Sequence, residues 1–219
     1  MNQALVIPTN TLSKISTKPS TKFPEVVMVR DELQILEAQW SLQDRRVCET
    51  DPNYLQILPY ITIKDYEGSI LSYRRGSASA ESRLLKKCSI GFGGHVEETL
   101  SNIETDLISK RASLLTLHTM RELNEELGLA FSYGLYKTIY SNLRYGDFYV
   151  IYSTESEVDR VHLCLHMDVY VNPYDLVKME KDVINDTLWA SAEELKDKHE
   201  DGSRVLEGWS KILLYEELV

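Results

Sequence analysis

The chain contains 219 residues, of which 43% are hydrophobic, so it is long enough to bury the core of one large domain. Asp and Glu number 34 against 24 Lys and Arg, which gives a formal net charge of -10. This acidic balance argues against binding to a nucleic-acid backbone, which relies on clustered Lys and Arg, and we expect no sequence-specific nucleic-acid recognition. A nucleotide substrate stays compatible with the charge, because a bound divalent cation can carry the charge of its phosphates.

The three cysteines, Cys48, Cys88 and Cys164, are widely spaced and form no CxxC pair or Cys/His cluster. Neither a disulfide framework nor a zinc site is therefore predicted, and we expect each thiol to fill a small apolar space in the core. The chain opens with no signal-peptide pattern and contains no apolar run of membrane-spanning length. We accordingly expect a cytoplasmic protein with no membrane contact.

The first half of the chain predicts mostly extended elements. In chain order we expect a strand at 4–8, a loop or arm at 9–24, a helical turn at 31–38, a strand at 57–65, its hairpin partner at 68–75, a polar connection at 76–87, and a short strand that runs into the glycines of CSIGFGGHV. Residues 1–50 are interpreted as an N-terminal extension to a domain at 51–219.

The second half of the chain predicts both strands and helices. In order, the patterns indicate a helix at 110–127 stopped by Gly128, strands near 131–140, 146–153, 161–171 and 183–189, and helices at 191–198 and 203–217. Strands that alternate with a few helices indicate an α+β or α/β fold, in which helices cover the faces of a mixed sheet.

Three acidic residues lie close together near the end of the helix predicted at 110–127. Glu122, Glu125 and Glu126 are spaced three and four apart, so they share one helix face, while Leu123 and Leu127 project to another face and can anchor it. A solvated acidic face is the usual explanation of such a trio. Arg121 can brace one carboxylate, however, and the upstream glycine pair can bring bare backbone close to a metal or a phosphate. Converging carboxylate oxygens suit Mg²⁺ or Mn²⁺.

The segment RELNEELGL resembles the second half of the Nudix box, G-x5-E-x7-R-E-U-x-E-E-x-G-U, in which U is apolar. Each fixed position of that half is filled in this sequence from Arg121 to Leu129. The upstream GGHVE resembles the glycine opening of the same box. QILPYITIKD, LSYRRG, SIGFGGHV, VHLCLHMDVYV and LEGWSKIL look like a branch of MutT-related proteins described as predicted phosphoesterases. This resemblance implies a Nudix α/β/α sandwich with a central mixed sheet.

The spacing inside the box departs from the family pattern. Arg121 follows Gly94 by 27 positions instead of the usual 14, so thirteen extra residues lie within an insert region at about 97–113. The mid-box glutamate of the family has no unambiguous counterpart, because a strict count back from Arg121 reaches Ser113. Looser candidates for that acid are Glu97, Glu98 and Glu104.

The resemblance implies hydrolysis of a diphosphate that is linked to another group, usually a nucleoside, with Mg²⁺ or Mn²⁺ as cofactor. It assigns Glu122, Glu125 and Glu126 as metal ligands, joined by a backbone carbonyl of the glycine pair, for which we choose Gly94. Either Glu122 or Glu125 also orients or deprotonates the attacking water. Arg121 holds a carboxylate in place. Such chemistry needs mainly electrostatic placement from the protein.

Several further residues are candidates for contacts outside the box. An acid on a loop before a late strand acts in several Nudix enzymes, and Glu180 is our choice here, with Glu155, Glu157 and Asp159 as alternatives. Arg74 and Arg75 lie at the end of a predicted strand and can grip a phosphate or serve as surface charges, and Lys110 and Arg111 offer the same chemistry in the insert. His95 can contact phosphate or bond to backbone.

Other residues favour structural roles. His162 and His166 share a strand face, but no acid or Cys in the sequence pattern completes a metal set with them, so we interpret them as sheet residues. Tyr60 and Tyr73 can stack on a base, although core packing is favoured.

Two alternative functions stay open, and the oligomeric state is an expectation only. The first alternative is a Nudix-fold module that senses a nucleotide without cleaving it. The second is an enzyme similar to isopentenyl-diphosphate isomerase, for which Cys88 is the only suggestive thiol. We expect a small-molecule substrate of the nucleoside-diphosphate type and a homodimer.

Overall fold

The computed structural model describes residues 3–14, 18–19, 26–30, 39–76, 86–96, 107–129, 132–145, 148–154, 159–176 and 184–219. Within them, the strands are β1 (Gln3–Pro8), β2 (Lys18–Pro19), β3 (Val26–Arg30), β4 (Ser41–Asp44), β5 (Tyr54–Lys64), β6 (Ile70–Arg75), β7 (Cys88–Ser89), β8 (Gly91–Phe92), β9 (Tyr149–Ser153), β10 (His162–Tyr170) and β11 (Ile184–Ala190). The α-helices are α2 (Arg45–Cys48), α3 (Leu107–Leu127), α4 (Tyr133–Tyr145), α5 (Ala192–Glu200) and α6 (Gly208–Tyr215), and the 3-10 helices are η1 (Thr9–Lys14), η4 (Asp159–Val161) and η5 (Pro173–Asp175).

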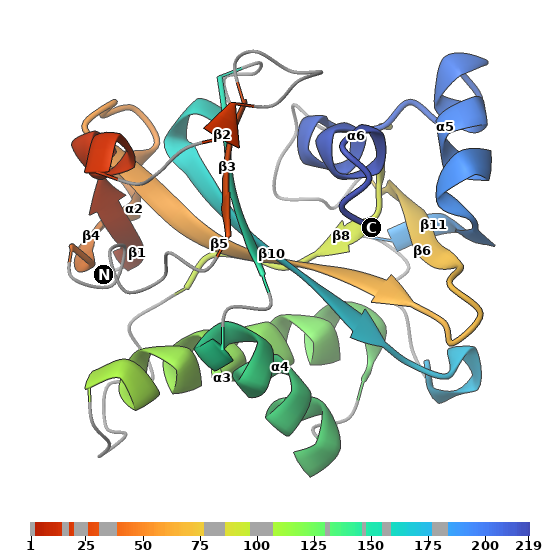
Figure 1. Cartoon of the computed structure of the whole chain (residues 1–219), viewed down its shortest axis with the longest axis horizontal. Helices are drawn as coiled ribbons and strands as arrows, with labels where there is room; N and C mark the ends of the chain where they lie inside the picture. Colours follow the sequence, from red (N-terminus) through yellow and green to blue (C-terminus); the bar gives the residue numbers. More distant parts are fainter. Residues whose placement is uncertain are drawn as a thin grey trace.

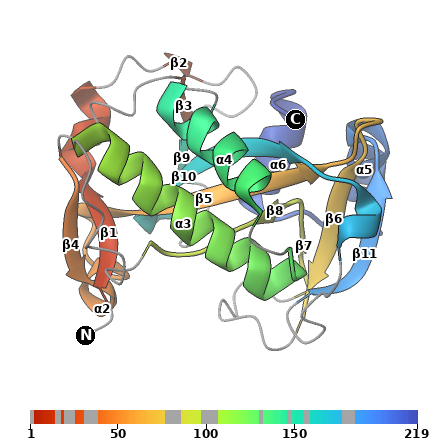
Figure 2. The same cartoon turned by 90° about the horizontal axis from the view of Figure 1, so that it is seen from below.

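One mixed sheet runs through the molecule (Figure 1). Its main path has the order β11-β6-β5-β10-β9-β3-β2, in which β5 and β10 pair in parallel and the other neighbours pair antiparallel. Strand β1 pairs with both β4 and β5, so residues of the first fifty belong to the same sheet. Helices α3 and α4 lie together across one face of the sheet (Figure 2), whereas α5 and α6 lie on the other side (Figure 1). The predicted sandwich of helices around a mixed sheet is confirmed.

The alternation of side chains along β5 produces the two cores. Leu55, Ile57, Ile61 and Ile63 occupy odd positions and pack in the core that contains α3 and α4. Tyr60 occupies an even position and packs with the apolar face of α6. Successive side chains of a strand point to opposite faces, so one central strand supplies a core on each side.

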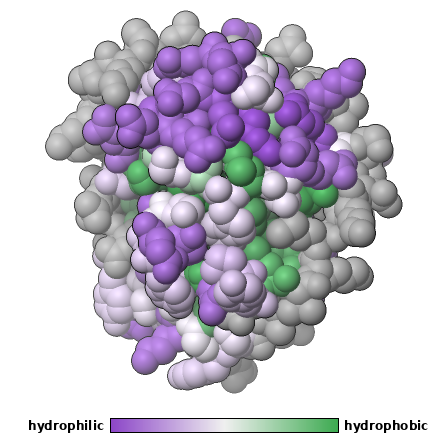
Figure 3. Space-filling view, turned by 90° about the vertical axis from the view of Figure 1, so that its right-hand side faces the viewer, coloured by the Kyte–Doolittle hydropathy of each residue, from purple (hydrophilic) through white to green (hydrophobic). Residues whose placement is uncertain are grey.

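On the outer surface, α5 contributes to the hydrophilic band at the top of Figure 3.

Most of the predicted elements are confirmed within a few residues, including the hairpin of β5 and β6, the strand β10 and the helix α3. Gly128 follows α3 with φ +64 and donates its N–H to the carbonyl of Asn124, as expected for a helix C-terminus. The loop expected at 9–24 contains η1 and β2 in its described part. The helical turn expected at 31–38 lies outside the described residues.

The strand expected at 131–140 is wrong, because helix α4 occupies Tyr133–Tyr145. Ser132 precedes the helix and its hydroxyl accepts a hydrogen bond from the N–H of Leu135 at 3.1 Å, which is an N-terminal cap. Ile139 and Leu143 are buried four residues apart, so they form one apolar helix face. The capping residue and this spacing outweigh the strand preference of the Tyr, Thr and Ile side chains.

A buried polar network joins helix α6 to the sheet. Glu207 Oε1 accepts hydrogen bonds from Tyr60 OH at 2.6 Å and from Ser89 Oγ at 2.5 Å, while Glu207 Oε2 accepts from Arg75 Nε at 2.9 Å. Ser210 Oγ lies 2.8 Å from Tyr60 OH and accepts the N–H of Ile90. The network therefore fixes the start of α6 against β5, β6 and β7.

Burial acts to raise the pKa of Glu207, but the charge of Arg75 and the hydrogen bonds from Arg75, Ser89 and Tyr60 outweigh it. The pKa of this carboxyl consequently lies below its ordinary value of 4.5. A group with a lowered folded-state pKa contributes stability above its unfolded-state pKa, and this contribution is lost as the pH falls.

We expect Glu207→Gln to lower the free energy of unfolding at neutral pH by about 3 kcal/mol, because it leaves the charge of Arg75 without its partner. The difference in free energy of unfolding between the variant and the unmodified chain should shrink as the pH falls below 4.5, because the stabilising effect of the Glu207 carboxylate is lost as the pH falls. Urea unfolding over this range measures both quantities. Glu193→Gln, an exposed acid on α5, is the control; a difference for Glu207→Gln that does not vary with pH would contradict the assignment.

Candidate functional site

The three glutamates lie in the last two turns of α3, on a helix that its apolar face anchors in the core. Leu123 and Leu127 are both fully buried. The side chain of Glu122 is only 16% exposed, whereas that of Glu125 is 57% exposed. Glu126 is intermediate in exposure. Glu122 is thus the acid held most firmly against the rest of the protein.

The glycine loop that follows β8 approaches this helix closely. A Cβ atom placed on Gly94 would lie 2.8 Å from Cδ of Glu122, so a side chain at position 94 would have to displace this carboxylate. The preceding Gly93 has φ +153, and a Cβ there would overlap the carbonyl oxygen of Pro59 in β5. The insert therefore separates the glycine pair from the glutamates in sequence, but Gly94 and Glu122 are adjacent in space.

Arg121 braces the acidic face. Its Nη2 atom donates to Glu122 Oε1 at 2.6 Å, and its Nε atom lies 4.0 Å from Glu125 Oε1. A charge-assisted hydrogen bond of this kind fixes the direction of a carboxylate as well as stabilising its charge. The contact with Glu122 is the one expected from the sequence, and a role of Arg121 in catalysis stays a prediction.

The two arginines proposed to grip a phosphate are engaged with other protein groups. Arg75 donates to Glu207 in the buried network described above. Arg74 pairs with Asp186 at 3.3 Å and donates to the carbonyl oxygens of Lys86 and Ser203. A contact of either arginine with substrate would have to compete with these bonds.

The tyrosines considered for base stacking are core residues. Tyr60 is 4% exposed and Tyr73 is 1% exposed. The ring of Tyr73 stacks on Phe92 with centroids 4.7 Å apart, and its hydroxyl donates to the carbonyl of Gly91. The expectation of core packing is confirmed for both.

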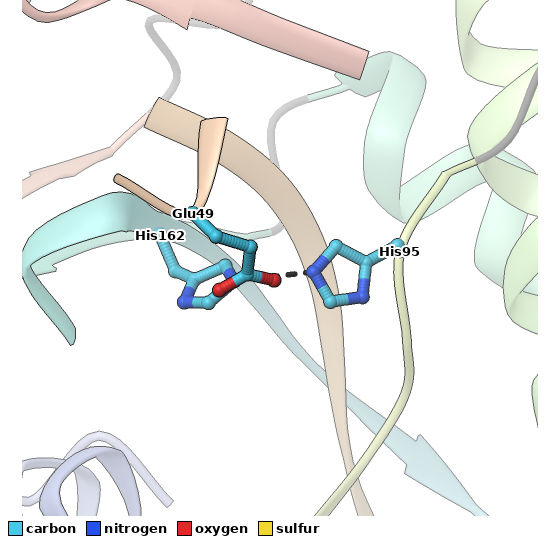
Figure 4. A group of neighbouring side chains, drawn as sticks. All are labelled: Glu49, His95 and His162. Carbon is cyan, nitrogen blue, oxygen red and sulfur yellow. Dashed lines mark hydrogen bonds between the residues drawn. The ribbon is translucent and has the colours of Figure 1, made fainter. Parts of the chain in front are cut away.

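His95 follows Gly94 and lies in a group with two residues from distant segments, Glu49 after α2 and His162 at the start of β10. One ligand atom from each of the three side chains lies within 4.8 Å of the others, and the side chains converge in Figure 4. Nε2 of His95 is 3.1 Å from Nε2 of His162. Burial, with the charges of Arg45 and His162, lowers the pKa of His95 to about 3, so its ring is neutral at ordinary pH.

This group was missed from the sequence. His162 was interpreted as a sheet residue because no acid accompanied it, but the fold brings Glu49 beside it. The one signal in the sequence was the position of His95 directly after the glycine pair, which indicated a functional contact for this side chain. His166, in contrast, keeps the structural role expected for it: its Nε2 is 2.9 Å from Thr62 Oγ1 and 3.5 Å from Asp168 Oδ1.

The candidate acids outside the box are only partly described. Glu180, Glu155 and Glu157 lie outside the described residues. Asp159 is buried, and a Cβ placed on Gly208 would lie 2.6 Å from Asp159 Oδ2. Asp159 therefore faces the N-terminus of α6, where a carboxylate is favoured by the helix dipole, on the side of the sheet opposite α3.

The thiol considered for an isomerase-like reaction is part of the core. Cys88 is fully buried, and its Sγ atom is 3.9 Å from Nη1 of Arg204. Burial raises the pKa of this thiol above its ordinary value. All three cysteines are free and buried, as expected.

Among the described helices, none is long and apolar enough to cross a membrane.

No family model matches the chain. Protein YmaB of Bacillus subtilis (strain 168) is 29% identical over 192 residues, which cover 88% of this chain and 85% of YmaB. Among solved structures, Tm1382, described as a candidate Nudix hydrolase, superposes with a TM-score of 0.65 at 25% identity and covers 97% of this chain and 96% of its own. A Nudix hydrolase from Alicyclobacillus acidocaldarius reaches a TM-score of only 0.44 at 11% identity, covering 74% of this chain and 90% of its own.

The two glycines of the loop give a direct test of its packing. Gly93→Ala should lower the free energy of unfolding by about 2 kcal/mol or more, because the new methyl group meets rigid backbone at a positive φ. Gly94→Ala should lower it less, because the atoms that it meets belong to the end of the flexible Glu122 side chain. Thermal unfolding of the two variants measures the difference. Equal loss in both would show that the loop does not lie against β5 and α3 as described.

Proposed function

The chain has the Nudix fold, and we propose that it is a Mg²⁺- or Mn²⁺-dependent hydrolase that cleaves the pyrophosphate linkage of a nucleoside-diphosphate-type substrate. The similarity to Tm1382, described as a candidate Nudix hydrolase, supports a hydrolase. The observation that carries the finer proposal is the carboxylate of Glu122, held by Arg121 against the bare backbone of Gly94.

The residues at this position fit a divalent ion of the Mg²⁺ class. Carboxylate and backbone carbonyl oxygens are the protein ligands that such ions take. A side chain at position 94 would fill the space beside Glu122, so the glycine keeps this carboxylate accessible. We assign Glu122, Glu125, Glu126 and the carbonyl of Gly94 as the ligands.

When bound, the ion supplies neutralisation of the phosphate oxygens and lowers the pKa of a coordinated water. The protein's own contribution is placement. Arg121 fixes the direction of the Glu122 carboxylate, and Leu123 and Leu127 hold the helix that presents it. Either Glu122 or Glu125 accepts the proton of the attacking water. Phosphoryl transfer needs little more than this from the protein, because it proceeds by positioning and electrostatic stabilisation.

The charge of the substrate is proposed to be met by the metal rather than by the arginines of β6. Arg74 and Arg75 are already paired with Asp186 and Glu207. Breaking the buried Arg75 pair would leave Glu207 uncompensated, at a cost of about 3–5 kcal/mol. The acidic chain as a whole likewise favours a substrate that arrives with a bound cation.

The proposal is tested by incubating the chain with Mg²⁺ or Mn²⁺ and a panel of nucleoside triphosphates, dinucleoside polyphosphates, ADP-ribose, NAD and capped RNA. Phosphate-containing products are measured by chromatography. We expect turnover of at least one compound and its loss after chelation of the metal. Glu122→Gln and Glu126→Gln should each lower kcat at least about 100-fold, the scale on which one electrostatic contact acts in a transition state.

Glu193→Gln is the matched control, because it removes one negative charge from an exposed position on α5. It should leave turnover unchanged. Full activity in Glu122→Gln would overturn the metal assignment. Binding of a compound without turnover of any would instead indicate a nucleotide-sensing module.

A further inference from the structure

Glu49, His95 and His162 come from three segments that are distant in the sequence. Glu49 directly follows the short helix α2, His95 lies in the glycine loop and His162 begins β10. All three point into one space, as Figure 4 shows, and their ligand atoms lie within 4.8 Å of one another. Sheet pairing holds the third of them in position, because His162 is in register with Gln56 of β5.

The distance between the two imidazoles suits two ligands of one ion. Nε2 of His95 and Nε2 of His162 are 3.1 Å apart. Nitrogen ligands of Zn²⁺ lie at about 2.0–2.1 Å from the metal, so two nitrogens at this separation subtend an angle of about 100° at the ion. This angle is close to that of a tetrahedral site. The pair therefore needs little movement to bind a metal.

From this geometry we propose that Glu49, His95 and His162 form a second metal site, which binds a transition ion of the Zn²⁺ class. Two imidazole nitrogens and one carboxylate are ligands that Zn²⁺, Co²⁺ and Fe²⁺ prefer, whereas Mg²⁺ prefers oxygen ligands alone. The site therefore differs in chemistry from the glutamates of α3. It does not depend on the hydrolase activity proposed above.

Gln56 supplies an independent observation that points to a ligand. Its side chain is fully buried, and its Nε2 atom is 3.3 Å from Nε2 of His162. Its Oε1 atom has no hydrogen-bond partner within the described part of the chain. The nitrogen and oxygen of an amide are assigned from hydrogen bonding rather than observed. A turn of this amide would direct the oxygen to the metal position or to a water bound there.

Arg45 opposes the site electrostatically. Its Nε atom is 3.5 Å from Glu49 Oε1, so the guanidinium already occupies one side of this carboxylate. A divalent ion must share Glu49 with this cation. Removal of the positive charge should consequently strengthen metal binding, whereas a purely structural hydrogen-bonded group would show no such response.

The histidine site is linked through the chain to the metal position proposed on α3. His95 directly follows Gly94, whose backbone lies against Glu122. The glycine loop thus carries one residue of each candidate site. An ion bound at the histidines would restrict the loop that keeps the Glu122 carboxylate accessible.

The test uses the full chain, stripped of metal with a chelator and then titrated with Zn²⁺ alone by calorimetry. Bound metal is counted by elemental analysis after dialysis. We expect Zn²⁺ to bind the histidine site of Glu122→Gln/Glu126→Gln as tightly as it binds that site in the unmodified protein, because the α3 acids are not among its ligands. His162→Gln and His95→Gln should weaken Zn²⁺ binding at least about 100-fold, which exceeds the 10–100-fold effect of losing an outer partner of a ligand.

His166→Gln is the matched control, because His166 lies on the same strand and the same face but binds Thr62 and Asp168 instead. It should bind Zn²⁺ as the unmodified chain does. Glu49→Gln, at a partly exposed position, should weaken binding about tenfold or more. Arg45→Gln should strengthen binding, because it removes the cation that competes with the metal for Glu49. Circular dichroism checks that each variant is folded.

Co²⁺ provides a second readout, since four- or five-coordinate Co²⁺ absorbs visible light strongly. The absorption should appear with the unmodified chain and with His166→Gln, and be lost in His162→Gln. Equal Zn²⁺ affinity in the unmodified chain and in folded Glu49→Gln and His95→Gln would overturn the proposal. So would Zn²⁺ binding that disappears when only the α3 acids are changed.

Discussion

The close approach of the glycine loop to strand β5 and helix α3 is the constraint on which both candidate sites depend. Side chains at Gly91 and Gly93 would collide with Tyr60 and Pro59, and one at Gly94 would meet Glu122. Because no side chains intervene, the backbone of the loop packs directly against β5, and this contact fixes its distance from the sheet. From that position it meets the acidic face of α3 and directs the next residue toward β10. A loop one methyl group farther away would separate both sets of side chains.

The buried pair of Arg75 and Glu207 has a structural role in the same region. Removing two charges from water is costly, and their attraction offsets this cost only with good geometry and further hydrogen bonds. Here Tyr60 and Ser89 supply those bonds. The network fixes α6 on one face of β5, while the apolar side chains of α3 pack on the other. Strand β5 is held from both sides, and the glycine loop rests on a rigid support.

Local patterns predicted the parts of this structure that local physics determines. The spacing of Leu123, Leu127 and the neighbouring acids defined the end of α3, and alternation defined β5 and β10. Helix α4 was missed because its Tyr, Thr and Ile residues favour strands. A cap at Ser132 and the buried Ile139 and Leu143 stabilise the helix instead. The histidine cluster could not be predicted, since its three members meet only through the register of β5 with β10 and the position of the loop. The pairing of Arg75 with Glu207 is non-local in the same way.

The parallel pairing of β5 with β10 also sets an order of events during synthesis. Gln56 and His162, which lie side by side in the sheet, are 106 residues apart in the chain. At a synthesis rate of about 5–20 residues per second, strand β5 leaves the ribosome roughly 5–20 s before its parallel partner. The residues that cover its other face, around Glu207, arrive later still. During that interval the edge of β5 that later pairs with β10 has no partner strand, so an apolar strand of the newly made chain is exposed to aggregation until the second half has emerged.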